Sequence, residues 1–174
     1  MDRLGFIHEE LDIKILILFV LRRLSGAVDG ETLRALCQSD GGVGYFDYAD
    51  CLSDLIETGH VLHTAEGYLI SEKGKKNADA VSSSLPYSVR AKAEKLIAPV
   101  EARLLRAAMI KTGHSMEDGG CFVELSMSDG KGEIIRLRLL CAGEEQAQIM
   151  EKNFRRDAEG FCQNIAALLS GERR

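Results

Sequence analysis

The sequence predicts an α+β protein whose helices come first and whose main sheet comes late. Apolar residues recur every three or four positions through residues 10–58, which is the spacing of buried helix faces. Apolar and polar residues alternate over residues 121–127 and 133–141, as in strands of a sheet that is covered on one side. The three-to-four spacing then returns over residues 147–168, which indicates a helix that covers this sheet.

The composition is that of a globular protein able to bury a core. The chain has 174 residues, 45% of them hydrophobic and 28% charged, which allows one large domain or two small ones. The longest apolar run, residues 15–21, is far shorter than the about 20 residues that cross a membrane. The N-terminus is acidic and has no small-residue cleavage site. We therefore expect a cytoplasmic protein that does not enter a membrane.

The cysteines argue against both disulfides and zinc. There are five, an odd number, and no two of them are spaced as Cys-x-x-Cys. A secreted disulfide framework needs paired cysteines, and a zinc site needs ligands at close spacing. We expect reduced thiols that are mostly buried.

Three helices are predicted in the first third of the chain. Residues 10–24 are apolar nearly all round, so this helix fits a core position or, as an alternative, a dimer interface. Asp29 is a suitable N-cap for a helix over residues 30–37, and Gly59 ends a third helix over residues 46–58. The inward positions of the third helix are Tyr48, Ala49, Leu52, Leu55 and Ile56. Its opposite face carries Asp47, Asp50, Asp54 and Glu57.

A hairpin and a fourth helix follow. Residues 61–64 and 68–70 are short β-prone runs joined at residues 65–67, which contain a glycine. Ser71 is a suitable cap for the next helix, which fades at the serines of 82–84. Three helices followed by a hairpin predict a winged helix-turn-helix domain over residues 1–84.

Residues 85–174 are predicted to form a second domain for dimerisation or effector binding. A helix begins at Pro86 and should end or kink at Pro99. A three-stranded antiparallel meander is expected between about residues 104 and 141, followed by one continuous helix over residues 144–170. That helix is longer than three strands require, so part of it is expected to pack on a second copy of the protein.

The chain has no motif that predicts catalysis. It lacks Gly-x-Ser-x-Gly, a P-loop and His-Glu-x-x-His. His60 and His63 are three residues apart in a predicted strand, so their side chains should point to opposite faces and cannot share a metal. We expect no enzyme activity, no cofactor and no metal site.

The winged-helix topology predicts binding to double-stranded DNA, with the third helix in the major groove. The candidate contacts are Tyr45, Phe46, Asp50, Arg34, Lys73, Lys75 and Lys76. Charge opposes this, because residues 1–84 hold 8 basic and 14 acidic side chains. The most basic stretch is residues 85–111, with six basic residues and two acidic ones. The alternative is a module that does not bind DNA and uses the acidic face of the third helix to bind a basic protein.

The sequence from the third helix onward resembles bacterial winged-helix regulators of the MarR and PadR kind. The pattern Leu-x-x-Leu-x-x-x-Gly stands at residues 52–59, and Ser-x-x-Gly at residues 71–74 opens the next helix. The order of elements along nearly the whole chain is also similar to a bacterial family known only as a domain of unknown function. The resemblance implies a winged-helix transcriptional regulator that forms a homodimer and has no catalytic residues.

Overall fold

A computed structural model describes residues 9–38 and 42–171 of the chain. The chain divides into two compact units, Met1–Leu105 and Arg106–Arg174. Each unit has its own hydrophobic core, and each is described by itself below. The boundary predicted after Ser84 falls just before the long helix that runs from the first unit into the second. Within the described ranges, no helix has the length and apolarity needed to cross a membrane.

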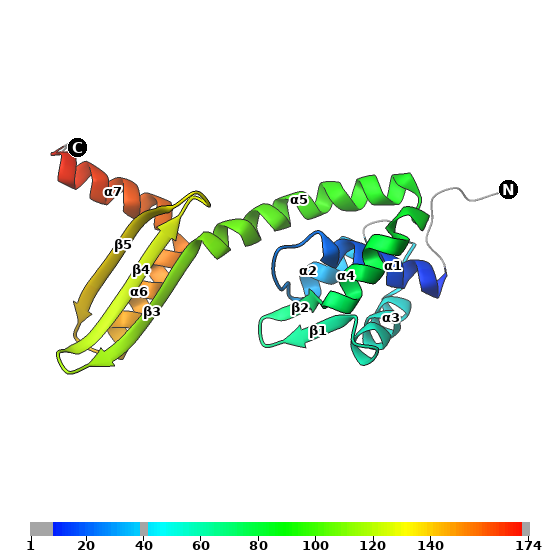
Figure 1. The fold of residues 1–174 in the computed structure, drawn as a ribbon, viewed down its shortest axis with the longest axis horizontal. Coiled ribbons are helices and arrows are strands. Elements are labelled where there is room, and N and C mark those ends of the chain that lie inside the picture. The colour runs from blue at the N-terminus through cyan, green and yellow to red at the C-terminus, as the bar shows by residue number, and fades with distance from the viewer. Residues whose placement is uncertain (1–8, 39–41, 172–174) are drawn as a thin grey trace. The chain divides into compact units, whose positions relative to one another are not determined.

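The first unit is built around its first helix (Figure 1). Its elements in order are α1 (Glu10–Arg22), α2 (Gly30–Cys37), α3 (Tyr45–Glu57), β1 (Val61–Thr64), β2 (Gly67–Ile70), α4 (Glu72–Val81), the 3-10 turn η1 (Ser82–Ser84) and α5 (Tyr87–Met109). Eight residues of α1 are buried, including all of residues 15–21. Helices α2, α3 and α4 all contact α1, which explains why it is apolar nearly all round. The core alternative predicted for this helix is therefore correct.

Local capping chemistry fixes where these elements begin and end. The Asp29 carboxylate accepts a hydrogen bond from the Thr32 amide at 2.8 Å, which starts α2. Gly59 has a φ of 73°, the left-handed conformation that glycine adopts readily after a helix. The Ser71 hydroxyl accepts a hydrogen bond from the Gly74 amide at 3.0 Å and donates one to the Gly59 carbonyl at 2.7 Å. The predicted caps at Asp29 and Ser71 and the stop at Gly59 are confirmed.

The hairpin of β1 and β2 is anchored to the segment that precedes α2. The Val28 amide donates to the Tyr68 carbonyl at 3.0 Å, and the Tyr68 amide donates to the Val28 carbonyl at 2.8 Å. This approach requires glycine at position 67, where φ is +125° and a Cβ would lie 2.2 Å from the Val28 oxygen. The sequence predicts Gly67 as part of the turn, but in the structure it is the first residue of β2.

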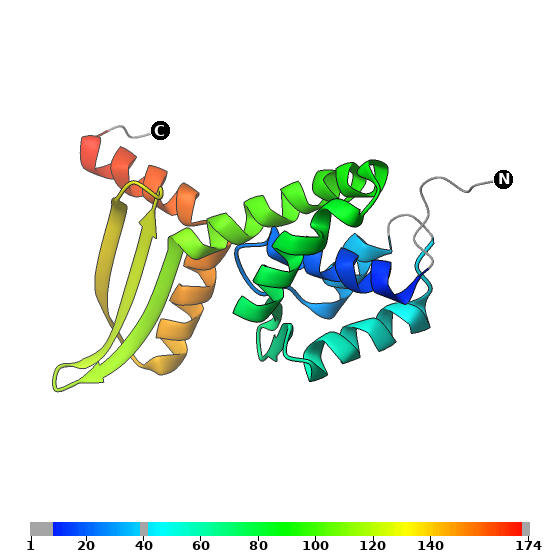
Figure 2. The ribbon, with the colours of Figure 1, turned by 45° about the vertical axis from the view of Figure 1, so that its right-hand side comes forward.

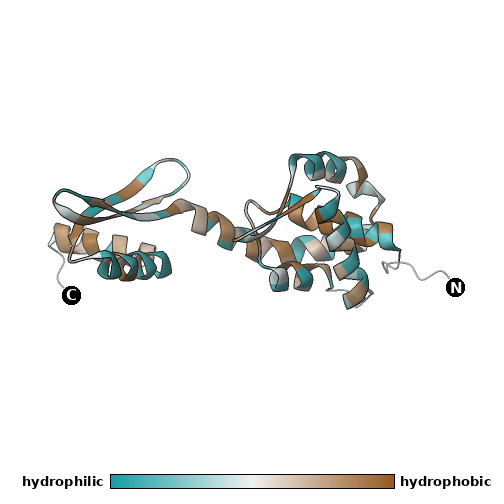
Figure 3. Ribbon diagram, turned by 90° about the horizontal axis from the view of Figure 1, so that it is seen from below, coloured by the Kyte–Doolittle hydropathy of each residue, from teal (hydrophilic) through white to brown (hydrophobic). Residues whose placement is uncertain are grey.

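The second unit is a three-stranded antiparallel meander with a helix on one face (Figures 1, 2 and 3). Strands β3 (Ile110–Glu117), β4 (Gly120–Ser128) and β5 (Glu133–Cys141) pair in sequence order. Helix α6 (Glu144–Arg156) packs on alternate residues of β4. The buried residues are Cys121, Val123, Leu125, Met127, Cys141, Ala147, Phe154 and Ala158. The predicted antiparallel sheet covered by a helix is confirmed.

Helix α5 does not end at Pro99, which was the first of the two outcomes predicted there, an end or a kink. It continues to Met109, so the meander begins at residue 110 rather than near 104. Residues beyond Pro99 still contact the first unit, because Val100 and Leu104 pack on its core. The Glu101 carboxylate also accepts a hydrogen bond from the Ser25 amide at 2.7 Å. Packing of this segment outweighs the amide hydrogen bond that a proline inside a helix removes.

The predicted single C-terminal helix is two helices. Helix α6 ends at Arg156, and α7 covers Ala158–Ser170. Asp157 lies between them with φ −151° and ψ 58°, and its carboxylate accepts a hydrogen bond from the Gly160 amide at 3.1 Å. A break of one residue leaves the three-to-four spacing of apolar residues almost unchanged, so periodicity alone does not reveal it.

Candidate functional site

The exposed surface of α3 is divided into two strips with different chemistry. The first strip faces α2 and the hairpin and consists of Tyr45, Ala49, Ser53 and Ile56. Together with Arg34 and Glu31 of α2 and Tyr68 of β2 it lines a hollow of about 590 Å³, which we call the α3 hollow. None of the four strip residues is acidic. Sequence periodicity had assigned Ala49 and Ile56 to the buried face, but both are only partly buried, while Cys51 is fully buried.

The second strip of α3 holds its four acids, and none of them lines the α3 hollow. Asp54 forms an ion pair of 2.8 Å with Lys14 of α1, which also pairs with Glu10 at 2.5 Å. Hydrogen bonds to Asp54 and Glu10 raise the pKa of the Lys14 ammonium. Part of the negative charge of α3 is therefore compensated within the unit. The acids Asp47, Asp50 and Glu57 remain exposed.

Two large aromatic residues are exposed at the start of α3. Tyr45 is 56% and Phe46 79% exposed, and their rings meet edge to face at 5.5 Å. The Arg34 guanidinium lies 5.8 Å from the centre of the Tyr45 ring, within range of a cation–π interaction. Arg34 makes no ion pair with any residue that the structure describes. The structure thus brings together three of the predicted contacts, Tyr45, Phe46 and Arg34, beside the α3 hollow.

The three predicted lysines of α4 differ in their surroundings. The Lys73 ammonium donates a hydrogen bond to the Thr58 carbonyl at 2.7 Å, at the C-terminal end of α3. This position suits a cation because helix carbonyls are unpaired there. Lys75 pairs with Glu72 at 2.7 Å. Lys76 is exposed and has no ion-pair partner in the described part of the chain.

The basic stretch predicted over residues 85–111 becomes a stripe on one side of α5. Lys92, Lys95 and Arg103 are exposed on one side of α5, outside the buried face of Val89, Ala93 and Ile97, and we call these three cations the α5 stripe. The two acids of α5 bind the first unit instead, because Glu94 pairs with Arg23 at 3.1 Å and Glu101 with the Ser25 amide.

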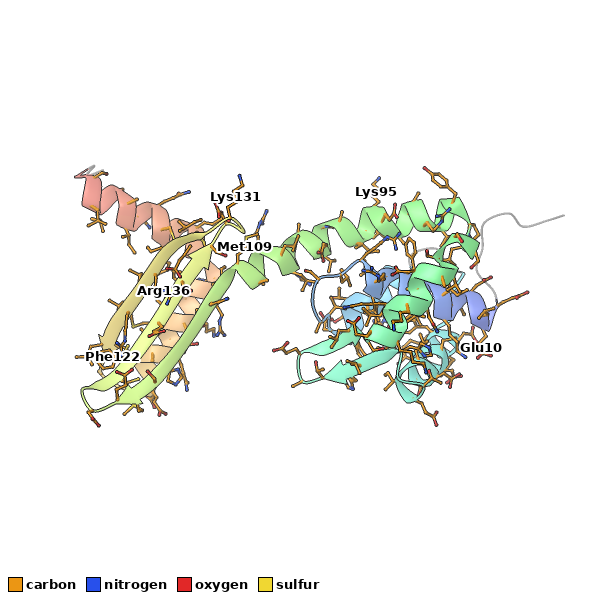
Figure 4. The ribbon with its side chains drawn as sticks, in the orientation of Figure 1. Glu10, Lys95, Met109, Phe122, Lys131 and Arg136 are labelled. Carbon is orange, nitrogen blue, oxygen red and sulfur yellow. The ribbon has the colours of Figure 1, made fainter. Side chains whose placement is uncertain are left out.

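Helix α5 and the hairpin lie on opposite sides of the first unit. Both ribbon views show this separation (Figures 1 and 2), and Figure 4 shows Lys95 pointing away from β1 and β2. The α5 stripe is therefore not part of the α3 hollow. The three cations of the α5 stripe do not add positive charge beside α3 and the hairpin, where the winged-helix hypothesis places the DNA.

The histidines near the hairpin have structural partners. His60 precedes β1, with its Nδ1 2.8 Å from the Thr58 hydroxyl and its Nε2 2.8 Å from the Asn77 amide. Burial, with a smaller effect of Lys73, lowers the pKa of His60. The His63 ring stacks on its cross-strand neighbour Tyr68 at 4.4 Å. Among residues 9–38 and 42–171, no three His, Cys, Asp or Glu side chains are grouped closely enough to hold a metal.

Sequence reasoning missed a polar cluster in the second unit. Glu151 of α6 is only 9% exposed and accepts hydrogen bonds from Thr112 (2.9 Å), His114 (2.6 Å) and Arg155 (3.1 Å). Burial raises the pKa of the Glu151 carboxyl, but these bonds outweigh it, so the pKa lies below its usual value. Only the spacing of Glu151 and Arg155, one helical turn apart, was visible in the sequence. The cluster joins α6 to β3.

A family model matches residues 13–169, most of the chain, and its description is "Domain of unknown function (DUF4364)". Comparison with curated proteins and with solved structures gives no match.

Proposed function

The chain belongs to the DUF4364 family, and we propose that it is a winged-helix DNA-binding transcriptional regulator acting as a homodimer. The order α1, α2, α3, β1, β2, α4 supports this proposal, because a winged helix-turn-helix domain, as in the MarR and PadR regulators that the sequence resembles, has three helices followed by a hairpin. In such domains the third helix enters the major groove and the hairpin lies beside the phosphates. The α3 hollow stands between these two elements.

The observation that carries this proposal is the separation of charge on α3. The strip beside the hairpin presents Tyr45 and Ser53, flanked by Arg34, without an acid of its own. The acids of the second strip do not line the hollow, and Lys14 of α1 compensates Asp54. A duplex approaching over the α3 hollow therefore meets an aromatic, hydroxyl and guanidinium surface with one carboxylate, Glu31 of α2, rather than the four carboxylates of α3.

The electrostatic attraction to DNA should nevertheless be weak. Arg34 and Lys76 are the two candidate cations that make neither an ion pair nor a hydrogen bond within the described residues. Each phosphate neutralised changes the slope of log K against log salt concentration by about −0.9. We therefore expect a slope of about −2 per subunit and about −4 for a dimer. Base contacts and hydrogen bonds then have to supply much of the affinity.

Fluorescence anisotropy with labelled duplex DNA, at low salt and over a salt titration, tests the proposal. Arg34→Ala should weaken binding about tenfold or more and reduce the salt slope by about 1 per subunit. Arg103→Ala is the matched control, because it removes an exposed arginine that belongs to the α5 stripe and does not line the α3 hollow. The proposal is wrong if the wild type does not bind random or upstream DNA at low salt, or if Arg103→Ala alone abolishes binding.

One observation favours an alternative, a winged-helix protein-interaction module that does not bind DNA. Phe46 is 79% exposed and lies next to the acidic strip, as an apolar anchor beside charges would in a docking site for a basic protein. Asp50→Lys separates the two functions. It should raise non-specific DNA affinity if α3 faces DNA, and it should weaken a basic partner's binding without creating DNA affinity if α3 is a docking face.

A further inference from the structure

Helix α7 carries an apolar stripe that its own unit leaves uncovered. Phe161, Ile165, Leu168 and Leu169 lie within one side of the helix, since they follow the spacing of 3.6 residues per turn. We call them the α7 stripe. Leu168 is 75%, Leu169 84% and Phe161 42% exposed. Figure 3 shows the brown, hydrophobic colour of α7 beside the teal of α6.

Only the first turns of α7 pack on the core of the second unit. Ala158 is the one buried residue of this helix, and Cys162 packs partly on the core of the sheet. The Phe161 ring lies 6.0 Å from the Phe154 ring of α6. From Ile165 to Ser170 the helix has no buried residue, although its amphipathic pattern is that of a helix that packs on another element.

We propose that the α7 stripe packs against the same stripe of a second copy of the chain, with the two α7 helices antiparallel about a two-fold axis. This inference deepens the homodimer part of the proposed function and rests on it. An isologous contact of this kind uses one patch twice, so the patch must be complementary to itself. A charged patch fails this condition because it meets its own charge.

The charge and size of side chains on α7 satisfy this condition. Residues 160–171 contain no charged side chain, so two copies meet without like-charge repulsion, and the surface offers nothing to a partner selected by charge. The antiparallel arrangement keeps the two Glu159 carboxylates at opposite ends and opposes the helix dipoles. Ala166 lies at the edge of the stripe, where its small side chain allows the helices to approach closely.

The exposed area fits a modest dimer interface. Four partly exposed side chains at about 100 Å² each give roughly 400 Å² of apolar surface, comparable to the largest patch of a typical monomer. A standard interface buries about 800 Å² per partner. The α7 stripe therefore supplies about half of this area, which fits a dimer of modest stability.

Sedimentation equilibrium of the full chain, without DNA, tests the inference. The wild type should be a dimer at micromolar concentration. Leu168→Glu should raise the dimer dissociation constant at least about tenfold, because it places a charge in the stripe at a position too exposed to affect folding. Ser170→Glu is the control with the same added charge on the polar side of α7, and it should remain a dimer.

The outcomes are separable from those of the DNA-binding experiment. A monomeric wild type, or a Leu168→Glu variant that dimerises as tightly as the wild type, overturns the inference. Unchanged circular dichroism of Leu168→Glu ensures that loss of the dimer is not loss of the fold. If the wild type dimerises through α7 but does not bind duplex DNA, the interface stands and the regulator proposal fails.

Discussion

Replacing Gly74 by alanine should destabilise the first unit, although the same change in an ordinary helix is stabilising. Gly74 lies in the first turns of α4 and is buried against the chain that leaves α3. A Cβ at this position would lie 2.2 Å from the His60 carbonyl oxygen and 2.8 Å from a side-chain carbon of Ile70. The same carbonyl accepts the Ser71 amide at 3.0 Å, so the backbone there is held from both sides.

The expected change in the free energy of unfolding is the sum of one stabilising and two destabilising contributions. Alanine gains about 1 kcal/mol over glycine in helix propensity. Moving a backbone carbonyl by about 1 Å in a packed site costs about 3 kcal/mol, at the upper end for overpacking. The shift also strains the Ser71 cap, which is worth about 1 kcal/mol. The net loss is about 3 kcal/mol, a factor of about 100 in the opening equilibrium of α4 and the hairpin.

Amide hydrogen exchange followed by mass spectrometry is the suitable measurement, because it reports on α4 and the hairpin separately from the second unit. Ala80→Gly is the control in the same helix, at an exposed position, and should cost only the propensity difference of about 1 kcal/mol. Slower or unchanged exchange in Gly74→Ala would refute the reasoning, because it would mean that the backbone accommodates a methyl group at this contact.

Further stability predictions concern two carboxylates. For each, the quantity measured is the free energy of unfolding of the wild type minus that of the variant. Asp29→Ala should cost about 1 kcal/mol, because Thr32 donates both its amide and its hydroxyl to this cap. These hydrogen bonds lower the pKa of Asp29, so urea unfolding should show the difference at neutral pH and its loss below about pH 4. Glu151→Gln should destabilise the second unit by about 2 kcal/mol through weaker bonds to His114 and Arg155. The pKa of Glu151 is also lowered, so this difference should vanish on acidification below about pH 4; a difference that grows on acidification would contradict the assignment.

Elements whose causes are local were predictable from the sequence. Asp29, Gly59 and Ser71 act on amides and carbonyls within a few residues, so their roles follow from residue type and position. The Ser-x-x-Gly pattern was visible as a helix start. The reason for its glycine was not, because the atom that excludes a side chain belongs to His60, fourteen positions earlier in the chain.

Two element boundaries were mispredicted, one for a distant cause and one for a local cause. An end of the helix at Pro99 is expected on local grounds, but contacts of Val100, Glu101 and Leu104 with the first unit accompany the continuation of α5 to Met109. The break at Asp157 was hidden because the apolar spacing crosses it almost unchanged. Its cause is local, since the Asp157 carboxylate accepts a hydrogen bond from the Gly160 amide.

The sequence by itself determined the order of helices and strands, the caps, the apolar faces and the amount of charge. Each of these depends on residue type and on periodicities within one element. Only the tertiary structure decided where the charge lies: it pairs Asp54 with Lys14, sets the acids of α3 apart from the hollow beside the hairpin, and places Lys95 on the far side of the unit. Electrostatic recognition depends on distances in space, and a count along the chain cannot supply them.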